Sequence, residues 1–250
     1  MCSLSLIAYS AWNLYTIRME YKEGTDLYEG VSQQYTKPRV YNNTKPSAPA
    51  PEEEEKKEGV PIEVDFDTLK ASNSDVIGWI YGEDTIIDYP VVQADDNSYY
   101  LRRMLNGKYN KNGTIFMDYR NSSDLSDFHT IIYGHNMKNN AMFGTLTEYA
   151  SQEYYDKHPV LWLLTPDKNY QIELIGGFIT PADSEIYSFP TTVEGRDKLI
   201  SIVCKKSNFK SEVEICPEDR IVTLSTCTYE YDDARYVLTG VLREYTEELQ

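Results

Sequence analysis

A series of short β-rich segments constrains the fold of this chain more than any other feature. Turn-forming stretches such as NGKYNKNG and TPDKN separate the segments. The predicted strands cover residues 76–80, 86–92, 114–117, 130–133, 160–165, 170–178, 221–227 and 235–242. Many strands with few helices predict a mainly β fold, and we expect a closed or nearly closed barrel.

Two helices are predicted beside these strands. The stretch VDFDTLKASN indicates a short helix with Asp65 as its N-cap that ends near Asn73. A long insertion, residues 180–220, precedes the strand 221–227. Four apolar residues of the insertion fall near helical spacing: Leu199, Ile202, Val203 and Phe209. We therefore expect a helix over one side of the barrel.

The chain divides into three predicted parts. Residues 1–41 start with an apolar stretch that is shorter than the roughly 20 residues needed to span a bilayer. They are interpreted either as the remaining part of a membrane anchor with a helix, or as an amphipathic helix packed on the domain. Residues 42–61 combine four prolines with a charge run and predict a linker. Residues 62–250 form the predicted folded domain.

Composition excludes several classes of function. The chain has 250 residues and a formal net charge of −16, which disfavours nucleic acid as a partner because phosphates are repelled. The four cysteines lack C-x-x-C spacing and only three histidines are present, so we expect no metal site. No cofactor motif occurs. We expect Cys204 and Cys216 to be unpaired thiols. A disulfide between them is the less favoured alternative.

The segment TLSTC ends a predicted strand on Cys227. Val222, Leu224 and Thr226 point to one face of this strand, which we assign to the core. The other face carries a mostly polar row that ends at Cys227, where a cleft is easily built. A lone cysteine is more often structural than catalytic, so the assignment of Cys227 as a nucleophile needs partners.

Arg235 and one histidine supply these partners. Arg235 starts the next strand after the loop TYEYDDA, so a hairpin would return it beside Cys227. A thiol with a pKa of about 8.5 needs a nearby cation or base, and arginine can serve only as the cation. Of the three histidines, His135 ends the apolar strand in TIIYGHNM and is the best candidate base. His129 and His158 are less well placed.

Other catalytic patterns are absent from the sequence. It contains no G-x-S-x-G, H-E-x-x-H, G-x-x-x-x-G-K-[ST] or G-x-G-x-x-G motif. The local patterns around the nucleophiles of papain-like enzymes and caspases are also missing. Serine hydrolases, zinc peptidases and nucleotide-binding enzymes therefore lose most of their support.

The conjunction of these residues resembles a sortase, one of the cysteine transpeptidases of Gram-positive cell surfaces. The resemblance rests on TLSTC, on an arginine eight positions after its cysteine, and on YGHNM about ninety residues upstream. DVIGWI, IDYPVVQADDNSYYL, GTIFMDYRN and the helix-bearing insertion resemble class B sortases. The resemblance covers roughly residues 62–245 and leaves out the proline-rich piece.

The resemblance implies an eight-stranded sortase-type barrel with N-terminal helices, and catalysis by His135, Cys227 and Arg235. Cys227 would attack the threonine carbonyl of a C-terminal sorting motif of the N-P-x-T-x kind and form a thioester. His135 would act as acid and base, and Arg235 would stabilise the oxyanion. The acyl group would pass to an amine of a peptidoglycan precursor or a pilin lysine. Ser225 and Thr226 are weaker candidates for substrate contacts.

The resemblance also implies where the protein acts. We expect a monomer on the extracellular face of the cytoplasmic membrane of a Gram-positive bacterium, attached through an N-terminal anchor if the full-length chain has one. Two alternatives stay open at this point. One is a non-catalytic β-barrel adhesin or binding module in which Cys227 is a buried thiol. The other is a cysteine protease that hydrolyses the same thioester.

Overall fold

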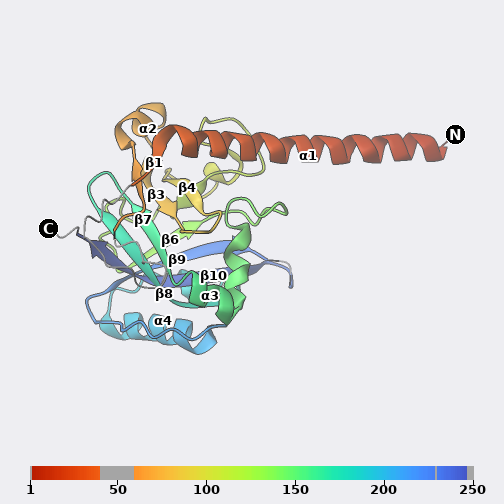
Figure 1. Cartoon of the computed structure of the whole chain (residues 1–250). Helices are drawn as coiled ribbons and strands as arrows, with labels where there is room; N and C mark the ends of the chain where they lie inside the picture. The colour runs from red at the N-terminus through yellow and green to blue at the C-terminus, as the bar shows by residue number, and fades with distance from the viewer. Residues whose placement is uncertain (1, 40–58, 229, 247–250) are drawn as a thin grey trace, which may run out of the picture.

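Eight strands close into a barrel in the computed structural model, which describes residues 2–39, 59–228 and 230–246 (Figure 1). Around the barrel the strand order is β10–β8–β7–β3–β4–β5–β6–β9. The strands are β3 (Val76–Tyr81), β4 (Asp88–Val92), β5 (Ile115–Met117), β6 (His129–Tyr133), β7 (Val160–Leu164), β8 (Asn169–Pro181), β9 (Arg220–Cys227) and β10 (Ala234–Tyr245). The predicted eight-stranded, mainly β barrel is confirmed.

The barrel mixes parallel and antiparallel pairs. β4 pairs with β5 and β6 pairs with β9 in parallel, whereas all the other neighbours are antiparallel. Because β6 and β9 run in the same direction, their carboxyl ends meet at one end of the barrel. β10 returns from β9 as a hairpin and begins at that same end.

Three strand boundaries differ from the prediction by two residues or more, one of them the end of β10, which continues from the predicted residue 242 to Tyr245. β4 begins at Asp88 rather than at residue 86, and β8 continues three residues past the predicted end at Phe178. The longer β8 follows from its pairing with β10, where Thr180 is the register partner of Arg235. Thr180 therefore belongs to the barrel and not to the insertion.

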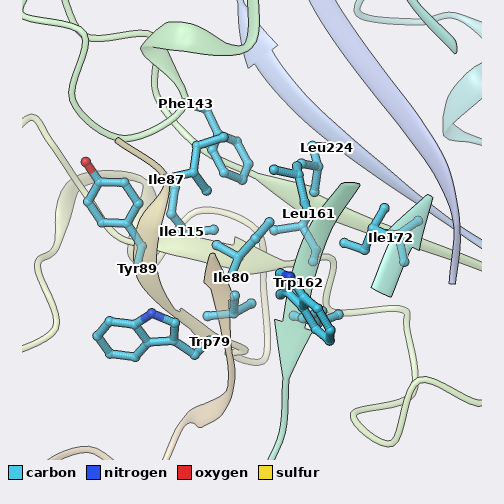
Figure 2. Close-up of a cluster of buried hydrophobic side chains, with 14 of the residues drawn as sticks. Trp79, Ile80, Ile87, Tyr89, Ile115, Phe143, Leu161, Trp162, Ile172 and Leu224 are labelled. Atoms are coloured by element: carbon cyan, nitrogen blue, oxygen red, sulfur yellow. The ribbon is translucent and has the colours of Figure 1, made fainter. Parts of the chain in front are cut away.

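The barrel interior holds the main hydrophobic core, part of which Figure 2 shows. Ile80, Leu161, Ile172 and Leu224 are buried and come from four different strands, and Figure 2 draws them together. Successive residues of a strand point to opposite faces, so every second side chain can enter the interior. Packing of these side chains holds the strands at fixed positions around the barrel.

A second core lies between the barrel wall and α4 (Val193–Lys206), which Figure 1 shows along one side of the barrel. α4 begins where the hydroxyl of Thr192 accepts a hydrogen bond from the backbone N–H of Gly195 at 3.2 Å, a capping contact. Leu199 and Val203 are buried on the face turned to the barrel. The predicted helix is thus confirmed, but Phe209 lies beyond its end, where it stacks on Tyr155 with ring centroids 4.2 Å apart.

The N-terminal helices and a two-stranded sheet complete the described chain. α1 (Cys2–Tyr35) is long, and its N-terminal part extends away from the barrel in Figure 1. Its last turns bury Tyr28 and Tyr35 in the main core. β1 (Thr36–Pro38) pairs with β2 (Ile62–Val64), and α2 (Phe66–Ser72) follows with Asp65 as its N-cap, as predicted.

Most of the predicted linker, residues 42–61, lies outside the described residues, so the three-part division stays a prediction. Among the helices that the structure describes, none combines the length and the apolar character that crossing a bilayer requires.

The second core predicts the effect of shortening Leu199. We expect Leu199→Ala to lower the free energy of unfolding by about 2–4 kcal/mol, because the substitution leaves a cavity between α4 and the barrel. Lys205→Ala, on the exposed side of the same helix, should change it by less than about 0.5 kcal/mol. Urea unfolding followed by circular dichroism measures both values. Equal losses in the two variants would contradict the assigned orientation of α4.

Candidate active site

The parallel ladder between β6 and β9 brings His135 and Cys227 to the same barrel end. Tyr133 and Ser225 are the last register partners of this ladder. The pairing continues one step further: Gly134 N–H donates to the Ser225 carbonyl at 3.1 Å, and the Thr226 hydroxyl donates to the Gly134 carbonyl at 2.8 Å. His135 follows directly after these two bonds, and Cys227 ends β9 beside it.

The hairpin between β9 and β10 brings Arg235 to Cys227. The two residues are direct register partners across the antiparallel pair. The Thr228 N–H donates to the Ala234 carbonyl at 3.0 Å and closes the connection between the strands. Backbone pairing of β9 with β10 therefore returns Arg235 to Cys227, as predicted.

The three side chains line one cavity of about 480 Å³. Ser225 and Thr226 belong to the same lining, and Cys227 is half-buried. No lining residue is acidic, although the whole chain carries a net charge of −16. A thiol, an imidazole and a guanidinium therefore line the same cavity.

His135 is held by a carbonyl group and is neutral at pH 7. Its Nε2 lies 2.6 Å from the Leu101 carbonyl oxygen, which can only accept, so Nε2 carries the hydrogen. Burial lowers the pKa of His135 below its ordinary value of 6.5. The positive charge of Arg102 acts in the same direction, and the bond to Leu101 opposes both. Nδ1 is then the nitrogen that can take up a proton.

Arg235 is held by one backbone contact among the described residues. Its Nη1 donates to the Ala234 carbonyl at 3.0 Å, and within the described residues no carboxylate forms an ion pair with it. Asp232 and Asp233 in the preceding loop are exposed. A guanidinium placed in this way can bind an anion or a carbonyl oxygen.

The polar face of β9 is more buried than the sequence pattern indicates. Thr223 has no exposed surface and Ser225 only 2%. The short helix Glu185–Tyr187 of the insertion covers this face, where the Tyr187 and Ser225 hydroxyls lie 2.8 Å apart. Only Cys227, at the strand end, comes out from under this cover.

The other two histidines lie away from the cavity. His129 is fully buried, its Nδ1–H donates to the Ser188 carbonyl at 2.9 Å, and its Nε2 accepts from the Thr223 hydroxyl at 2.8 Å. Thr223 in turn lies 2.9 Å from the Thr239 hydroxyl, so the network joins three strands. His158 ends α3 (Gln152–Lys157) and bonds the Glu83 carbonyl. Neither lines the cavity with Cys227.

Several lining residues were not predicted as site residues. Asn97, Arg120 and Tyr133 come from two loops and the end of β6, and Tyr187 comes from the insertion. Asn97 and Arg120 lie in DDNSYYL and GTIFMDYRN, stretches whose polar residues directly beside apolar runs were a usable signal. No local pattern indicates Tyr187.

Comparison with known proteins decides the family. No protein-family model matches the chain. Sortase B of Listeria monocytogenes is 31% identical over 243 residues, which are 96% of this chain and 93% of that protein.

This chain belongs to the sortase B family. Sortases B are cysteine transpeptidases that act at the surface of Gram-positive bacteria, and this sortase B shares their cell-wall sorting activity. The non-catalytic adhesin is therefore not favoured.

Solved sortase B structures agree with the barrel. Bacillus anthracis sortase B in complex with AAEK1 has a TM-score of 0.74 at 29% identity, over 91% of this chain and 99% of that one. The Staphylococcus aureus sortase B–substrate complex has a TM-score of 0.69 at 29% identity, over 72% and 85%. A sortase B complexed with triglycine also has 0.69 at 29% identity, over 72% and 86%.

The buried His129 predicts a loss of stability in acid. Burial is the main cause that lowers the pKa of His129 to about 4, whereas the unfolded chain has the ordinary value of 6.5. The unfolded state therefore binds the extra proton first as the pH falls below 6.5. We expect this difference in pKa to lower the free energy of unfolding by about 3 kcal/mol. The loss develops as the pH falls from 6.5 to 4 and is complete below pH 4.

The measurement is the free energy of unfolding of the wild type and of His129→Gln as a function of pH. The difference between the two proteins removes the contribution of the carboxylates. It should change steadily across the window from pH 6.5 to 4. A difference that stays flat would contradict a buried, neutral His129.

Proposed function

We propose that this sortase B cleaves a C-terminal sorting motif of the N-P-x-T-x kind after its threonine, with Cys227 as nucleophile, His135 as acid and base, and Arg235 as oxyanion ligand. The observation that supports this assignment is the cavity that the three side chains line together. A barrel with no catalytic task has no physical need for this combination at its strand ends.

The attack of Cys227 on the threonine carbonyl forms a carbon–sulfur bond and a tetrahedral oxyanion. The thiol proton moves to His135 Nδ1, since Nε2–H is bound to Leu101. Arg235 stabilises the negative oxygen, and its positive charge is worth more in a partly buried site than in water.

Collapse of the intermediate breaks the peptide bond after threonine. The protonated His135 gives its proton to the leaving amine, and a thioester between the threonine and Cys227 remains. An incoming amine then attacks the thioester carbonyl and forms a carbon–nitrogen bond, while the carbon–sulfur bond breaks and Cys227 leaves as the thiolate. Neutral His135 accepts the proton of the amine, a role that fits the lowered pKa of this imidazole.

Two classes of partner follow from this chemistry. The acyl donor is the sorting-signal peptide of a surface protein or pilin, in line with the substrate complex of the S. aureus enzyme. The acceptor is an amine of a peptidoglycan precursor or a pilin lysine, in line with the sortase B complexed with triglycine. We place the reaction on the extracellular face of the cytoplasmic membrane, where both partners occur.

Ser225 and Thr226 are proposed as secondary substrate contacts. Both line the cavity, but each hydroxyl already has a protein partner, Tyr187 and the Gly134 carbonyl respectively. Ser225 can still accept or donate one further bond, as a hydroxyl has one donor and two acceptor positions. The Thr226 hydroxyl also secures the ladder that holds His135.

Removal of the nucleophile or the base tests the assignment. Cys227→Ala should abolish both cleavage and transfer, and His135→Ala should lower kcat by roughly 10²–10⁴-fold. His158→Ala, outside the cavity, should behave as the wild type. Fluorescent sorting-motif peptides are incubated with and without triglycine or lysine, and the adducts are identified by mass spectrometry. Continued turnover by Cys227→Ala would overturn the proposal, and hydrolysis alone in the presence of amines would indicate a protease.

Arg235→Lys separates charge from geometry. Lysine keeps the positive charge but lacks the planar fork of donors, so the oxyanion loses a directed hydrogen bond. We expect kcat to fall roughly 100-fold, with a small change in KM. Steady-state kinetics with one peptide and one amine measure both constants. Near wild-type kcat would show that charge alone suffices.

A further inference from the structure

A buried carboxylate lies behind the wall of the candidate site. Asp118 follows β5, and its backbone N–H donates to the Ile131 carbonyl at 2.9 Å, which fixes it against β6. Its side chain has 0% exposed surface. Ionised side chains are almost never fully buried unless they are paired, so the partners of Asp118 indicate its role.

Three residues of the cavity lining donate hydrogen bonds to this carboxylate. Arg120 donates from Nε at 2.8 Å and from Nη2 at 2.7 Å, the Tyr133 hydroxyl donates at 2.9 Å, and Asn97 Nδ2 donates at 3.0 Å. Asp118 itself does not line the cavity. The hydrogen bonds of Asp118 to the cavity wall therefore run through the side chains of these three residues.

All three residues are also held from a second side, Tyr133 by the rings of Phe116 and Tyr187, whose centroids lie 5.3 and 6.4 Å from its own. The Asn97 Oδ1 accepts from the Tyr119 backbone N–H at 3.0 Å, which fixes the orientation of the amide. The Arg120 guanidinium lies over the Phe189 ring, 4.4 Å from its centroid. The wall is thus arranged before a peptide binds, which lowers the entropy cost of ordering it.

The same contacts set the charges in the cavity. Burial alone would raise the pKa of Asp118, but the hydrogen bonds from Arg120, Tyr133 and Asn97 outweigh it and the pKa is lowered. Burial, and then the negative charge of Asp118, raise the pKa of Tyr133. At pH 7 the carboxylate is ionised and neutralises Arg120. Of the two guanidiniums in the lining, Arg235 is the one without an ion pair among the described residues.

We propose that Asp118 is a positioning residue that sets the peptide selectivity of the site. It fixes Asn97, Arg120 and Tyr133 for hydrogen bonding to an uncharged peptide segment. It also cancels the charge of Arg120, so that acidic side chains gain little from approaching this side of the cavity. Without this carboxylate, Arg120 becomes a second cation that attracts acidic peptides. The inference rests on the proposed function and concerns how the same cavity selects its acyl donor.

The test compares the wild type with Asp118→Asn, which keeps the shape and removes the charge. Three sorting-motif peptides differ only at the variable position before the threonine, which carries glutamine, glutamate or lysine. We expect KM for the glutamine peptide to rise roughly tenfold while kcat stays within about twofold. The ratio of kcat/KM for the glutamate peptide over the glutamine peptide should rise roughly tenfold.

Two further variants separate selectivity from general damage. Asp127→Asn is the matched control, because Asp127 also accepts bonds, from Asn121 Nδ2 at 2.9 Å and from Ser122 N–H at 2.7 Å, yet neither partner lines the cavity. It should keep wild-type KM and peptide preference. In Asp118→Asn combined with Arg120→Gln, the preference for the glutamate peptide should disappear.

The outcomes decide between the two proposals. If the wild type turns over none of the three peptides, the proposed function fails. If the wild type is active and Asp118→Asn has the same peptide ratio, or loses kcat equally for all three peptides, the inference about Asp118 is overturned alone. Should Asp118→Asn not fold, Tyr133→Phe removes one donor and keeps the charge. It should raise KM severalfold without changing the peptide ratio, and an unchanged KM would refute the positioning role.

Discussion

The parallel pairing of β6 with β9 is the contact on which the candidate site depends. Five register pairs, from His129 with Ile221 to Tyr133 with Ser225, bring the two carboxyl ends to the same level. The backbone bonds of Gly134 and the hydroxyl of Thr226 extend this alignment to the residues before His135 and Cys227. A shift of one residue in this ladder would turn every side chain of β9 to the opposite face and remove the thiol from the cavity.

The charge of the cavity lining is opposite in sign to the net charge of the chain. The chain is strongly acidic, yet the cavity wall contains two guanidiniums and no carboxylate. Two guanidiniums in one partly buried cavity repel each other, and this repulsion costs free energy unless neighbouring groups neutralise or fix them. Asp118 resolves this for Arg120 from behind the wall, whereas Arg235 is held by the Ala234 carbonyl alone among the described residues. The positive charge that stays available in the cavity is that of Arg235, and it can stabilise negative charge that develops on a reacting carbonyl.

The sequence predicted the strands and the return of Arg235 to Cys227 because both depend on local signals, whereas His135 was assigned from its place at a strand end and from the resemblance, since its approach to Cys227 depends on the long-range pairing of β6 with β9. Alternating apolar residues mark the strands, and the short loop after Cys227 specifies a hairpin that returns Arg235. The second wall of the cavity could not be predicted in this way. Asn97, Arg120 and Tyr187 reach the site only when the barrel closes and the insertion folds over β9. The burial of Thr223 and Ser225 was missed for the same reason, since their cover comes from a distant segment.

A site built on backbone pairing has a further physical consequence. Ladder hydrogen bonds depend on the register of the strands and not on the identity of most side chains. The interior of the barrel can therefore exchange one apolar residue for another of similar volume while the strand ends stay in place. Two residues at the end of the ladder are sensitive to exchange. At the glycine before His135 an added Cβ would lie 2.4 Å from Ile115 and 2.6 Å from Phe143, so both side chains would have to move. Loss of the Thr226 hydroxyl would remove its bond to the Gly134 carbonyl. These two residues hold the imidazole and the thiol in place without themselves reacting.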